Sequence, residues 1–533
     1  MMCRLLVWVL CVSVLDMDMT WGLVVRGSGH SQYSRVRRTS RVLRGESGSS
    51  VDEGGKSEIK VNVRLLDGID GVERESWNRL VENSHPFLLY DWILSLEKSG
   101  CASAEAGWQP LHIIAEKLVN EETKESELIG AMPLYAKSHS YGEFIFDQSW
   151  ADYAQRVLGI KYYPKLLSAV PFTPATGSRL LLSDTLTPKE IEGVSTVMMN
   201  AMKTLMQQNR LSGAHANFLK EEEVDAFLKN DYVLRQTVQY RWNNKRLTQE
   251  GNEQKFRDMN REEGGLEEAT KTFTTFDDYL TCFKSKRRTQ IKRERKSVYD
   301  EQGILLKVIR GNDPEYATPE LYQKMYEIYT TTIDKMWGQR YLSSDFFRNL
   351  ASAPSEFRER IVFIVAYDPN RPPAPPKPEG VREQVLDFMD GFLDLKTQKQ
   401  TQKQSLERAK EDEGIKEDGS PYRIDNIIAG TINLVSDTHF YGRYWGALEY
   451  RKHLHFETCY YKSIEFCIEN GLKILEPGAG GGEFKFLRGF DPFLINSVHT
   501  FNSPILQKAV SQFVDEEREY NEEVKNYLLS SRR

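Results

Sequence analysis

Cysteine is scarce in this chain of 533 residues, and its six cysteines form no recognisable pattern. Cys3 and Cys11 lie close to the N-terminus, and the other four are widely spaced. Because no Cys-x-x-Cys pair occurs, we predict neither a zinc site nor a framework of disulfides. A reducing compartment agrees best with this cysteine content.

Long apolar runs and a strong net charge are also missing. After the first residues, no segment reaches the roughly 18 uninterrupted apolar residues that a membrane-spanning helix needs, so we expect no stable membrane insertion. The net charge is only −6, which gives no global reason to expect a nucleic-acid partner. The chain is too long for a single hydrophobic core, and this length predicts two domains or a large duplicated one.

The N-terminus has the composition of a targeting segment. An apolar run at residues 5–15 is too short to span a membrane, and from Met19 to Gly45 arginines alternate with serines in the absence of acidic residues. This pattern is typical of an organelle transit peptide, with a plastid favoured over a mitochondrion. A secretory signal and an ordinary disordered N-terminus remain alternatives. We expect residues 1–55 to be a targeting or disordered segment.

The rest of the chain indicates an internal duplication. Strand, helix, hairpin, helix and strand patterns follow one another at 56–245 and again at 301–510. The predicted hairpins join 111–118 to 128–136 and 361–367 to 426–435. Between the domains we expect an acidic linker and a basic helix at 246–300. A Pro-rich and then Gln/Lys/Glu-rich stretch at 369–422 predicts a disordered insertion, and 511–533 a C-terminal helix.

This element order is that of the acyl-CoA N-acyltransferase (GNAT) fold, and several aromatic-rich blocks resemble the FemAB-like, peptidoglycan biosynthesis/recognition family. The resemblance implies an α/β protein of duplicated GNAT-like domains, with mixed, largely antiparallel sheets flanked by helices. It also implies an N-acyltransferase that transfers an acyl or aminoacyl group to an amine. Ala447 and Phe484 depart from the cysteine and the polar residue, often histidine, that the family resemblance leads us to expect. The matching blocks are residues 131–154, 162–181, 284–296, 335–342, 442–446, 454–472, 476–479 and 488–490.

Acyl transfer to an amine needs a base for the amine proton and an acid for the leaving group. The segment HLHFETCYY at 453–461 concentrates suitable side chains just after GRYWG. We predict Glu457 or His455 as the base and Tyr444 or Tyr460 as a proton donor. A helix cap with stacked aromatic rings is the alternative for any one of these residues.

Further polar and aromatic residues are predicted to bind the substrate. Arg443 is the preferred anchor for an anion or carboxylate, because a guanidinium can make bidentate contacts. Glu476, at a predicted strand end, is a second carboxylate suited to a substrate ammonium group. The other predicted binding residues are Asp147, Trp150, Tyr153, Trp337, Trp445 and Lys485.

Two other chemistries are less favoured by the spacing. His453, His455 and Glu457 would share one face only on a strand, whereas the following residues have a helical pattern, so no metal site is predicted. The segment ILEPGAGGG at 474–482 resembles the nucleotide loop of S-adenosylmethionine methyltransferases. Only 51 residues follow Gly482, too few for the doubly wound sheet that such a loop requires, so a glycine turn is favoured.

The donor is predicted to be acyl-CoA or aminoacyl-tRNA. Residues 284–296, KSKRRTQIKRERK, hold eight basic side chains and one glutamate, and a helix of this kind could meet tRNA or a phosphate-rich donor. A solvated helix that pairs with acidic neighbours remains equally open. The acceptor is expected to be a small molecule, an amino acid or a glycan. A non-catalytic module that recognises amino acids or glycans is the alternative function.

Overall fold

The computed structural model describes residues 61–120, 125–247, 270–335, 338–372, 422–480 and 482–531. The predicted leader, most of the predicted insertion at 369–422, and Trp337 lie outside the described residues. Both predicted hairpins are present as antiparallel strand pairs.

The first half of the chain runs from strand β1 to strand β9. Helix α5 begins at a capping box, in which Thr187 accepts a hydrogen bond from the Glu190 N–H and Glu190 accepts one from the Thr187 N–H. Pro188 opens this helix, a position at which its missing N–H costs nothing. The elements are β1 Val61–Leu66, η1 Ile69–Gly71, α2 Arg74–Asn78, η2 Glu82–Ser84, α3 Tyr90–Lys98, β2 Trp108–Pro110, β3 His112–Asn120, β4 Glu125–Met132, β5 Leu134–Lys137, α4 Gln148–Arg156, β6 Lys165–Ser168, β7 Leu181–Leu182, α5 Pro188–Gln208, β8 Gly213–Leu219, α6 Glu221–Leu228 and β9 Val233–Asn243.

The second half begins after a connecting segment and ends in the long helix α18. Strands β13 and β14 are buried at every residue, as expected for apolar central strands that are covered on both faces. The elements are β10 Arg246–Leu247, β11 Thr270–Lys271, α8 Phe276–Leu280, α9 Ser285–Lys296, η4 Ser297–Glu301, β12 Leu305–Arg310, α10 Pro319–Lys335, α11 Ser344–Ala351, α12 Ser355–Arg358, β13 Ile361–Tyr367, η5 Ile424–Asn426, β14 Ile427–Val435, β15 His439–Ala447, α15 Leu454–Phe456, η6 Glu457–Tyr461, α16 Lys462–Glu469, β16 Ile474–Glu476, α17 Glu483–Phe486, β17 Asp491–Phe501 and α18 Pro504–Ser531.

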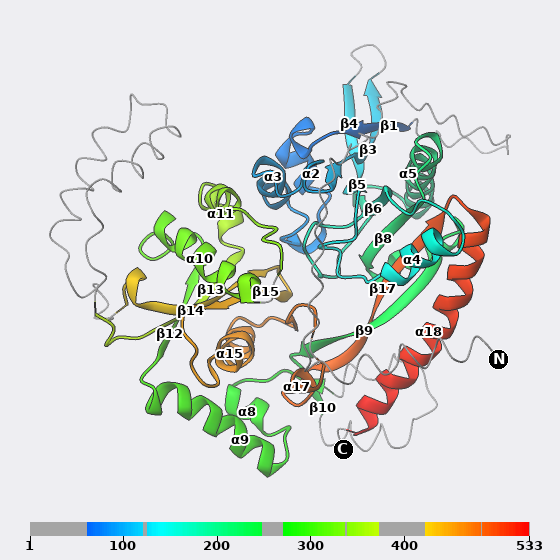
Figure 1. Ribbon diagram of the computed structural model, residues 1–533. Coiled ribbons are helices and arrows are strands. Elements are labelled where there is room, and N and C mark those ends of the chain that lie inside the picture. The colour runs from blue at the N-terminus through cyan, green and yellow to red at the C-terminus, as the bar shows by residue number, and fades with distance from the viewer. Residues whose placement is uncertain are drawn as a thin grey trace, which may run out of the picture. The chain divides into compact units, whose positions relative to one another are not determined.

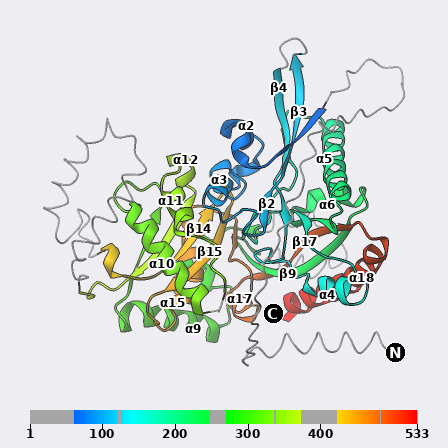
Figure 2. The ribbon, with the colours of Figure 1, turned by 45° about the horizontal axis from the view of Figure 1, so that its top comes forward.

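Strands β9 and β17 are exchanged between the two halves. In the described residues an eleven-stranded sheet runs in the order β12-β13-β14-β15-β16-β9-β17-β8-β6-β5-β2. Strand β9 of the first half therefore pairs with β16 of the second, and β17 of the second half pairs with β8 of the first. The two exchanged strands also pair with each other, and α18 lies along them (Figures 1 and 2). Main-chain hydrogen bonds thus join the halves.

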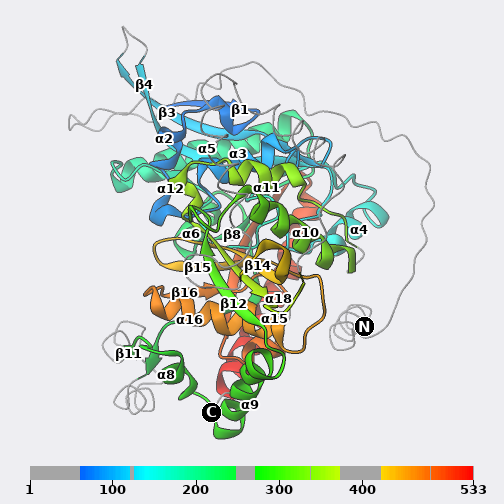
Figure 3. The same cartoon turned by 90° about the vertical axis from the view of Figure 1, so that its left-hand side faces the viewer.

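Strand pairing follows the same pattern within each half. In the second half β12, β13, β14 and β15 are antiparallel neighbours, and β15 pairs in parallel with β16. In the first half β5 and β6 are antiparallel, and β6 pairs in parallel with β8. Helix α10 contacts β14 and β15, and α16 contacts β15 and β16 from the other layer (Figure 3). This arrangement confirms the predicted α/β fold of duplicated GNAT-like domains.

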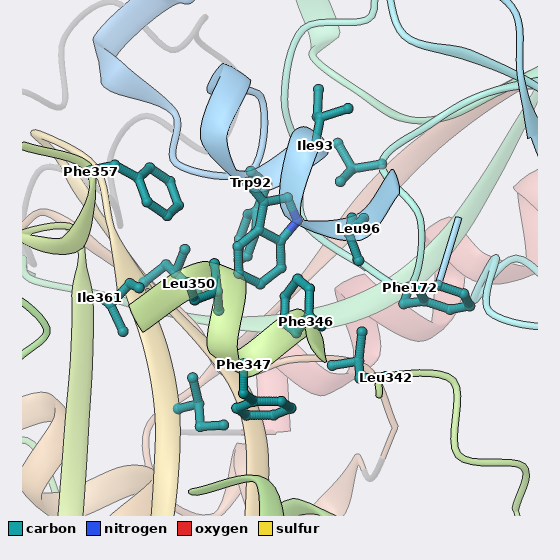
Figure 4. Packing of buried hydrophobic residues seen from close by; sticks show 14 of the residues in the cluster. Trp92, Ile93, Leu96, Phe172, Leu342, Phe346, Phe347, Leu350, Phe357 and Ile361 are labelled. Carbon is teal, nitrogen blue, oxygen red and sulfur yellow. The ribbon is translucent and has the colours of Figure 1, made fainter. Parts of the chain in front are cut away.

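The two halves share a hydrophobic core. Helix α3 of the first half packs against α11 of the second, where the rings of Trp92 and Phe346 meet edge to face with centroids 5.1 Å apart (Figure 4). Both side chains are buried, and each such residue contributes about 1.5–3 kcal/mol of hydrophobic free energy. The core and the exchanged strands together fix the second-half sheet against the loops of the first half.

Candidate active site

The sheet opens between β15 and β16. These strands pair in parallel only over His439–Tyr441 and Ile474–Glu476, and β15 then continues to Ala447. A bulge in β15 leaves Arg443 without a partner residue on β14. Beyond the last pair, no strand of the described residues lies along the edge of β15 that faced β16. The Ala447 N–H at the far end donates to the Thr331 hydroxyl, and the backbone groups nearer the opening can serve a ligand.

The glycine-rich segment after β16 is a turn that leaves the sheet. Gly478 and Gly480 have positive φ angles of 86° and 81°, which residues with side chains rarely adopt. A Cβ atom on Gly478 would also lie 3.1 Å from the carbonyl oxygen of Gly442. The chain passes from this turn into α17 and β17, so the segment is a tight turn rather than the phosphate loop of a doubly wound sheet.

Glu476 is the last residue of β16, and its carboxyl group is buried at the opening. Its Oε2 atom accepts a 3.4 Å hydrogen bond from the backbone N–H of Thr176, in the loop after β6. Burial raises the pKa of Glu476 to about 7, because the Thr176 N–H and Arg241 offset only part of the desolvation cost. Near neutral pH this carboxyl group can both accept and release a proton.

Lys485 of helix α17 reaches back to the glycine turn. Its ammonium group is buried and donates a 2.7 Å hydrogen bond to the carbonyl oxygen of Gly478, two residues after Glu476. Burial lowers the pKa of Lys485 to about 8, with a small opposing effect from Cys459. A lysine that titrates in this range can stabilise a developing negative charge or deliver a proton.

His455, Trp445 and Tyr460 form an aromatic group next to Lys485. The His455 ring lies 5.3 Å from the Trp445 ring and 5.5 Å from the Tyr460 ring. Burial lowers the pKa of His455 to about 4, and the nearby Arg488 and Lys485 act in the same direction. The imidazole is therefore neutral near pH 7. Burial also raises the pKa of Tyr460.

Glu457 is engaged by the basic helix α9. Its buried carboxylate accepts hydrogen bonds of 3.2 Å from Arg295 Nε and 2.9 Å from the Tyr299 hydroxyl. Arg295 also contacts Glu465 of α16 at 3.4 Å. Burial raises the pKa of Glu457, and Arg295 opposes that change. These contacts make Glu457 an anchor between η6 and α9.

Arg443 and Tyr444 lie where the first half meets β15. Nη2 of Arg443 donates to the carbonyl oxygen of Phe172 and, at 3.2 Å, to the hydroxyl of Tyr444. The guanidinium also lies 5.9 Å and 5.8 Å from the ring centroids of Phe87 and Phe144. Tyr444 is buried, and burial raises its pKa.

Three of the predicted binding residues, Asp147, Trp150 and Tyr153, lie in the first half and contact residues outside the β15–β16 opening. Asp147 is buried against Lys165, which holds its pKa at about 2 although burial alone would raise it. Trp150 is buried in a hydrophobic cluster with residues of β17 and α18. Tyr153 is 40% exposed on α4. Their described contacts do not group these residues with those at the β15–β16 opening.

Thr176 is a residue of the opening that the sequence did not single out. Its N–H donates to Glu476, and its carbonyl oxygen lies 2.9 Å from Nε2 of His85. The surrounding loop is rich in Pro, Thr and Ala, a composition that carries no chemical signal. Only the contact between the halves identifies Thr176.

Among the described residues, no group of three or more His, Cys, Asp or Glu side chains is arranged to hold a metal ion. None of the described helices is long and apolar enough to cross a membrane. None of the described cysteines, Cys101, Cys282, Cys459 and Cys467, forms a disulfide.

A comparison with protein families matches most of the chain to the FemAB-like family, described as peptidoglycan biosynthesis/recognition. The matched residues are 68–258, 249–374 and 420–531. The unmatched residues between 374 and 420 lie within the predicted insertion. No curated protein matches the chain.

Three solved structures align with most of the chain. FemX is 12% identical with a TM-score of 0.40, over 83% of this chain and 98% of FemX. L-PGS from Bacillus licheniformis is 8% identical with a TM-score of 0.36, over 79% and 95% of the two chains. A tandem GNAT protein from the clavulanic acid biosynthesis pathway is 7% identical with a TM-score of 0.34, over 83% and 99%. Similarity at this level carries no argument about activity.

Proposed function

The chain belongs to the FemAB-like family, and from this premise we propose that it transfers an acyl or aminoacyl group to an amine at the opening between β15 and β16. The observation that supports this best is a buried carboxyl group, Glu476, and a buried ammonium group, Lys485, at one glycine turn. Their pKa values of about 7 and about 8 suit proton transfer near neutral pH.

In the proposed reaction, the acceptor nitrogen bonds to the carbonyl carbon of the donor, and the bond from that carbon to the carrier's sulfur or oxygen breaks. Glu476 takes the proton that the amine loses. Lys485 gives a proton to the leaving sulfur or oxygen, and a backbone N–H of β15 beyond its paired segment donates to the carbonyl oxygen. Exchange with water returns both side chains to their starting states.

Glu476 fits the role of base better than Glu457, whose carboxylate is already engaged by helix α9. His455 is neutral, and the rings around it restrict its access to a substrate. Tyr444 and Tyr460 keep their protons because burial raises the pKa of both hydroxyl groups. Both tyrosines are therefore assigned as hydrogen-bond donors rather than as bases.

Helix α9 favours a donor that carries a phosphate backbone. Lys286, Arg293 and Lys296 are exposed on it and have no carboxylate within 4 Å among the described residues. The helix is fixed to the turn that follows α17, because the buried Glu294 pairs with Arg488 at 2.9 Å. An aminoacyl-tRNA that binds α9 would therefore meet a surface held rigidly next to Lys485. Acyl-CoA is the competing donor.

A recognition module of the same fold is the second candidate function. Phe484 stands where the family resemblance leads us to expect a polar residue. Its ring lies 6.1 Å from the Tyr460 ring and 6.5 Å from the His455 ring, so the neighbourhood of Lys485 is more apolar than a proton-transfer site requires. A module of this kind would bind amino acids or glycans without turnover.

The proposal is tested by the pH dependence of kcat/KM for the full chain, with acyl-CoAs or aminoacyl-tRNAs as donors and amino acids or amino sugars as acceptors. Activity requires Glu476 without its proton and Lys485 with its proton. We therefore expect a bell-shaped profile with limbs near pH 7 and pH 8. Because a guanidinium stays charged and does not release its proton, Lys485→Arg should lose most of the turnover and show no alkaline limb in what remains, whereas the control Lys462→Arg should keep both.

Two outcomes would count against this assignment. An alkaline limb that persists in Lys485→Arg would show that another group supplies the proton. Binding of acceptors without turnover of any donor, in wild type and variants alike, would favour the recognition module.

A further inference from the structure

Arg241 is a cation at the junction of the two halves, and the described residues give it no ion-pair partner within 4 Å. It lies on the exchanged strand β9, and its guanidinium carbon is 4.7 Å from the ring centroid of Phe493 on β17. Among the described residues, no carboxylate lies within 4 Å of it and no side-chain hydrogen bond holds it. The side chain is half-buried, so water compensates its charge only in part.

Arg443 lies on β15, in the second half. The two hydrogen bonds that its Nη2 makes go to uncharged oxygens, a backbone carbonyl and a tyrosine hydroxyl. Its Nε is buried and has no hydrogen-bond partner. No carboxylate among the described residues lies within 4 Å of this guanidinium either. A guanidinium with an unused buried N–H is suited to a planar or tetrahedral anion.

One hydrophobic cluster contacts the rings on which the two arginines lie, and Glu476 lies near Arg241. Arg443 lies over the ring of Phe144, Arg241 lies over the ring of Phe493, and both rings pack on the same buried cluster. Arg241 is also close enough to Glu476 to lower its pKa, and Arg443 follows Tyr441, the residue that pairs with Glu476, by two positions. The Glu476 carboxyl group bonds to Thr176 and forms an ion pair with neither arginine.

We propose that Arg241 and Arg443 together bind an anionic group of the acceptor, a carboxylate or a phosphate, beside the carboxyl group of Glu476. This inference rests on the proposed function, because it places the acceptor rather than the donor on this side of the opening. The two guanidinium groups come from different halves, so the site exists only when β9 is exchanged. The anion fixes the acceptor, and the amine a short distance from it then points at Glu476.

Isothermal titration calorimetry of the full chain tests this site with simple probes. The probes are inorganic phosphate, inorganic pyrophosphate, N-acetylglycine and, as the uncharged counterpart, N-acetylglycinamide. We expect at least one anion to bind and the amide not to bind. Arg241→Gln and Arg443→Gln should each weaken that binding roughly 10- to 100-fold, as expected for the loss of a charge-assisted hydrogen bond. Arg156→Gln, at an exposed position on α4, is the matched control and should bind as wild type does.

The relative affinities of the probes show whether the acceptor's anionic group is a carboxylate or a phosphate. Stronger binding of N-acetylglycine assigns a carboxylate, and stronger binding of phosphate or pyrophosphate assigns a phosphorylated acceptor. Unchanged affinity in both Gln variants, or equal binding of the amide, would overturn the proposal. Arg443→Lys keeps the positive charge but lacks the paired N–H donors of a guanidinium, so it should retain part of the anion affinity. Partial affinity in this variant would show that the protein is folded and that the Gln variants lose binding at the site itself.

The same titrations distinguish this inference from the proposed function. Lys485→Met should lose turnover and keep anion binding, because Lys485 lies on α17 and contacts neither arginine. Anion binding that depends on the two arginines, in a protein whose turnover survives Lys485→Met, would refute the catalytic assignment and leave the anion site standing.

Discussion

Replacing Glu476 with Gln should stabilise the protein at pH 8 while it removes most of the proposed transferase activity. The carboxyl group has a pKa of about 7 in the fold and an ordinary value of 4.5 when exposed. Between these values the folded chain holds a proton that the unfolded chain has lost, so the free energy of unfolding falls as the pH rises. Each pKa unit between the folded and unfolded states corresponds to about 1.4 kcal/mol. Ionisation of Glu476 therefore lowers the free energy of unfolding by about 3 kcal/mol above pH 7.

The glutamine of the Glu476→Gln variant would carry no charge, and its amide oxygen can still accept the hydrogen bond from Thr176. The variant should therefore exceed wild type by about 3 kcal/mol in unfolding free energy at pH 8 and match it closely near pH 4.5. Urea unfolding followed by intrinsic fluorescence at several pH values measures this difference. Because the amine then lacks its base, kcat/KM should fall by about 10²- to 10⁴-fold.

Glu469→Gln is the matched control, since this residue is exposed at the end of α16 and should change neither quantity. Equal stability of Glu476→Gln and wild type at every pH would show that the carboxyl group is not ionised at a cost. A variant that is less stable at pH 8 would also refute the reasoning. Gains in stability that accompany a loss of activity are the expected mark of a group held charged for function.

Two further predictions concern regions away from the opening. Lys165→Met should lower the free energy of unfolding by about 3–5 kcal/mol, because the buried carboxylates of Glu143 and Asp147 would lose the cation that bridges them; urea unfolding measures the change. Replacing Lys286, Arg293 and Lys296 of α9 with Gln should weaken tRNA binding and reduce the slope of log Kd against log salt by about 2–3 in filter-binding assays. Equal slopes in the variant and wild type would exclude α9 as the docking surface. The matched control replaces the α18 residues Lys508, Arg518 and Lys525.

Much of the fold could be predicted because its elements carry strong local patterns. The hairpin strands are β-rich runs separated by polar connections, and α5 carries a capping box at its start. The exchange of β9 and β17 could not be predicted in the same way. The alternation of a strand specifies which of its faces is buried, and it does not specify which strand lies beside it.

The sequence indicates several residues of the candidate site, but it does not indicate which residues they contact. The sequence groups His455, Tyr460 and Trp445, and the structure brings these residues together beside Lys485. Glu457 is attractive in the sequence because it lies between these residues, yet Arg295 of a distant segment engages its carboxylate. Ion pairs between segments more than 160 residues apart leave no local signal, and such pairs decide which carboxylate is free to act.

Strand register shows how the ends of the two parallel strand pairs differ between the halves. In the second half the last parallel pair before the opening is Tyr441 with Glu476, and in the first half the corresponding pair is Ser168 with Ala216. Ala216 has no ionisable group, so duplication of the fold did not duplicate the acid. The first half instead supplies the Thr176 N–H and, through the exchanged strand β9, Arg241. Removal of either half should therefore eliminate the site, because each half contributes groups that the other lacks.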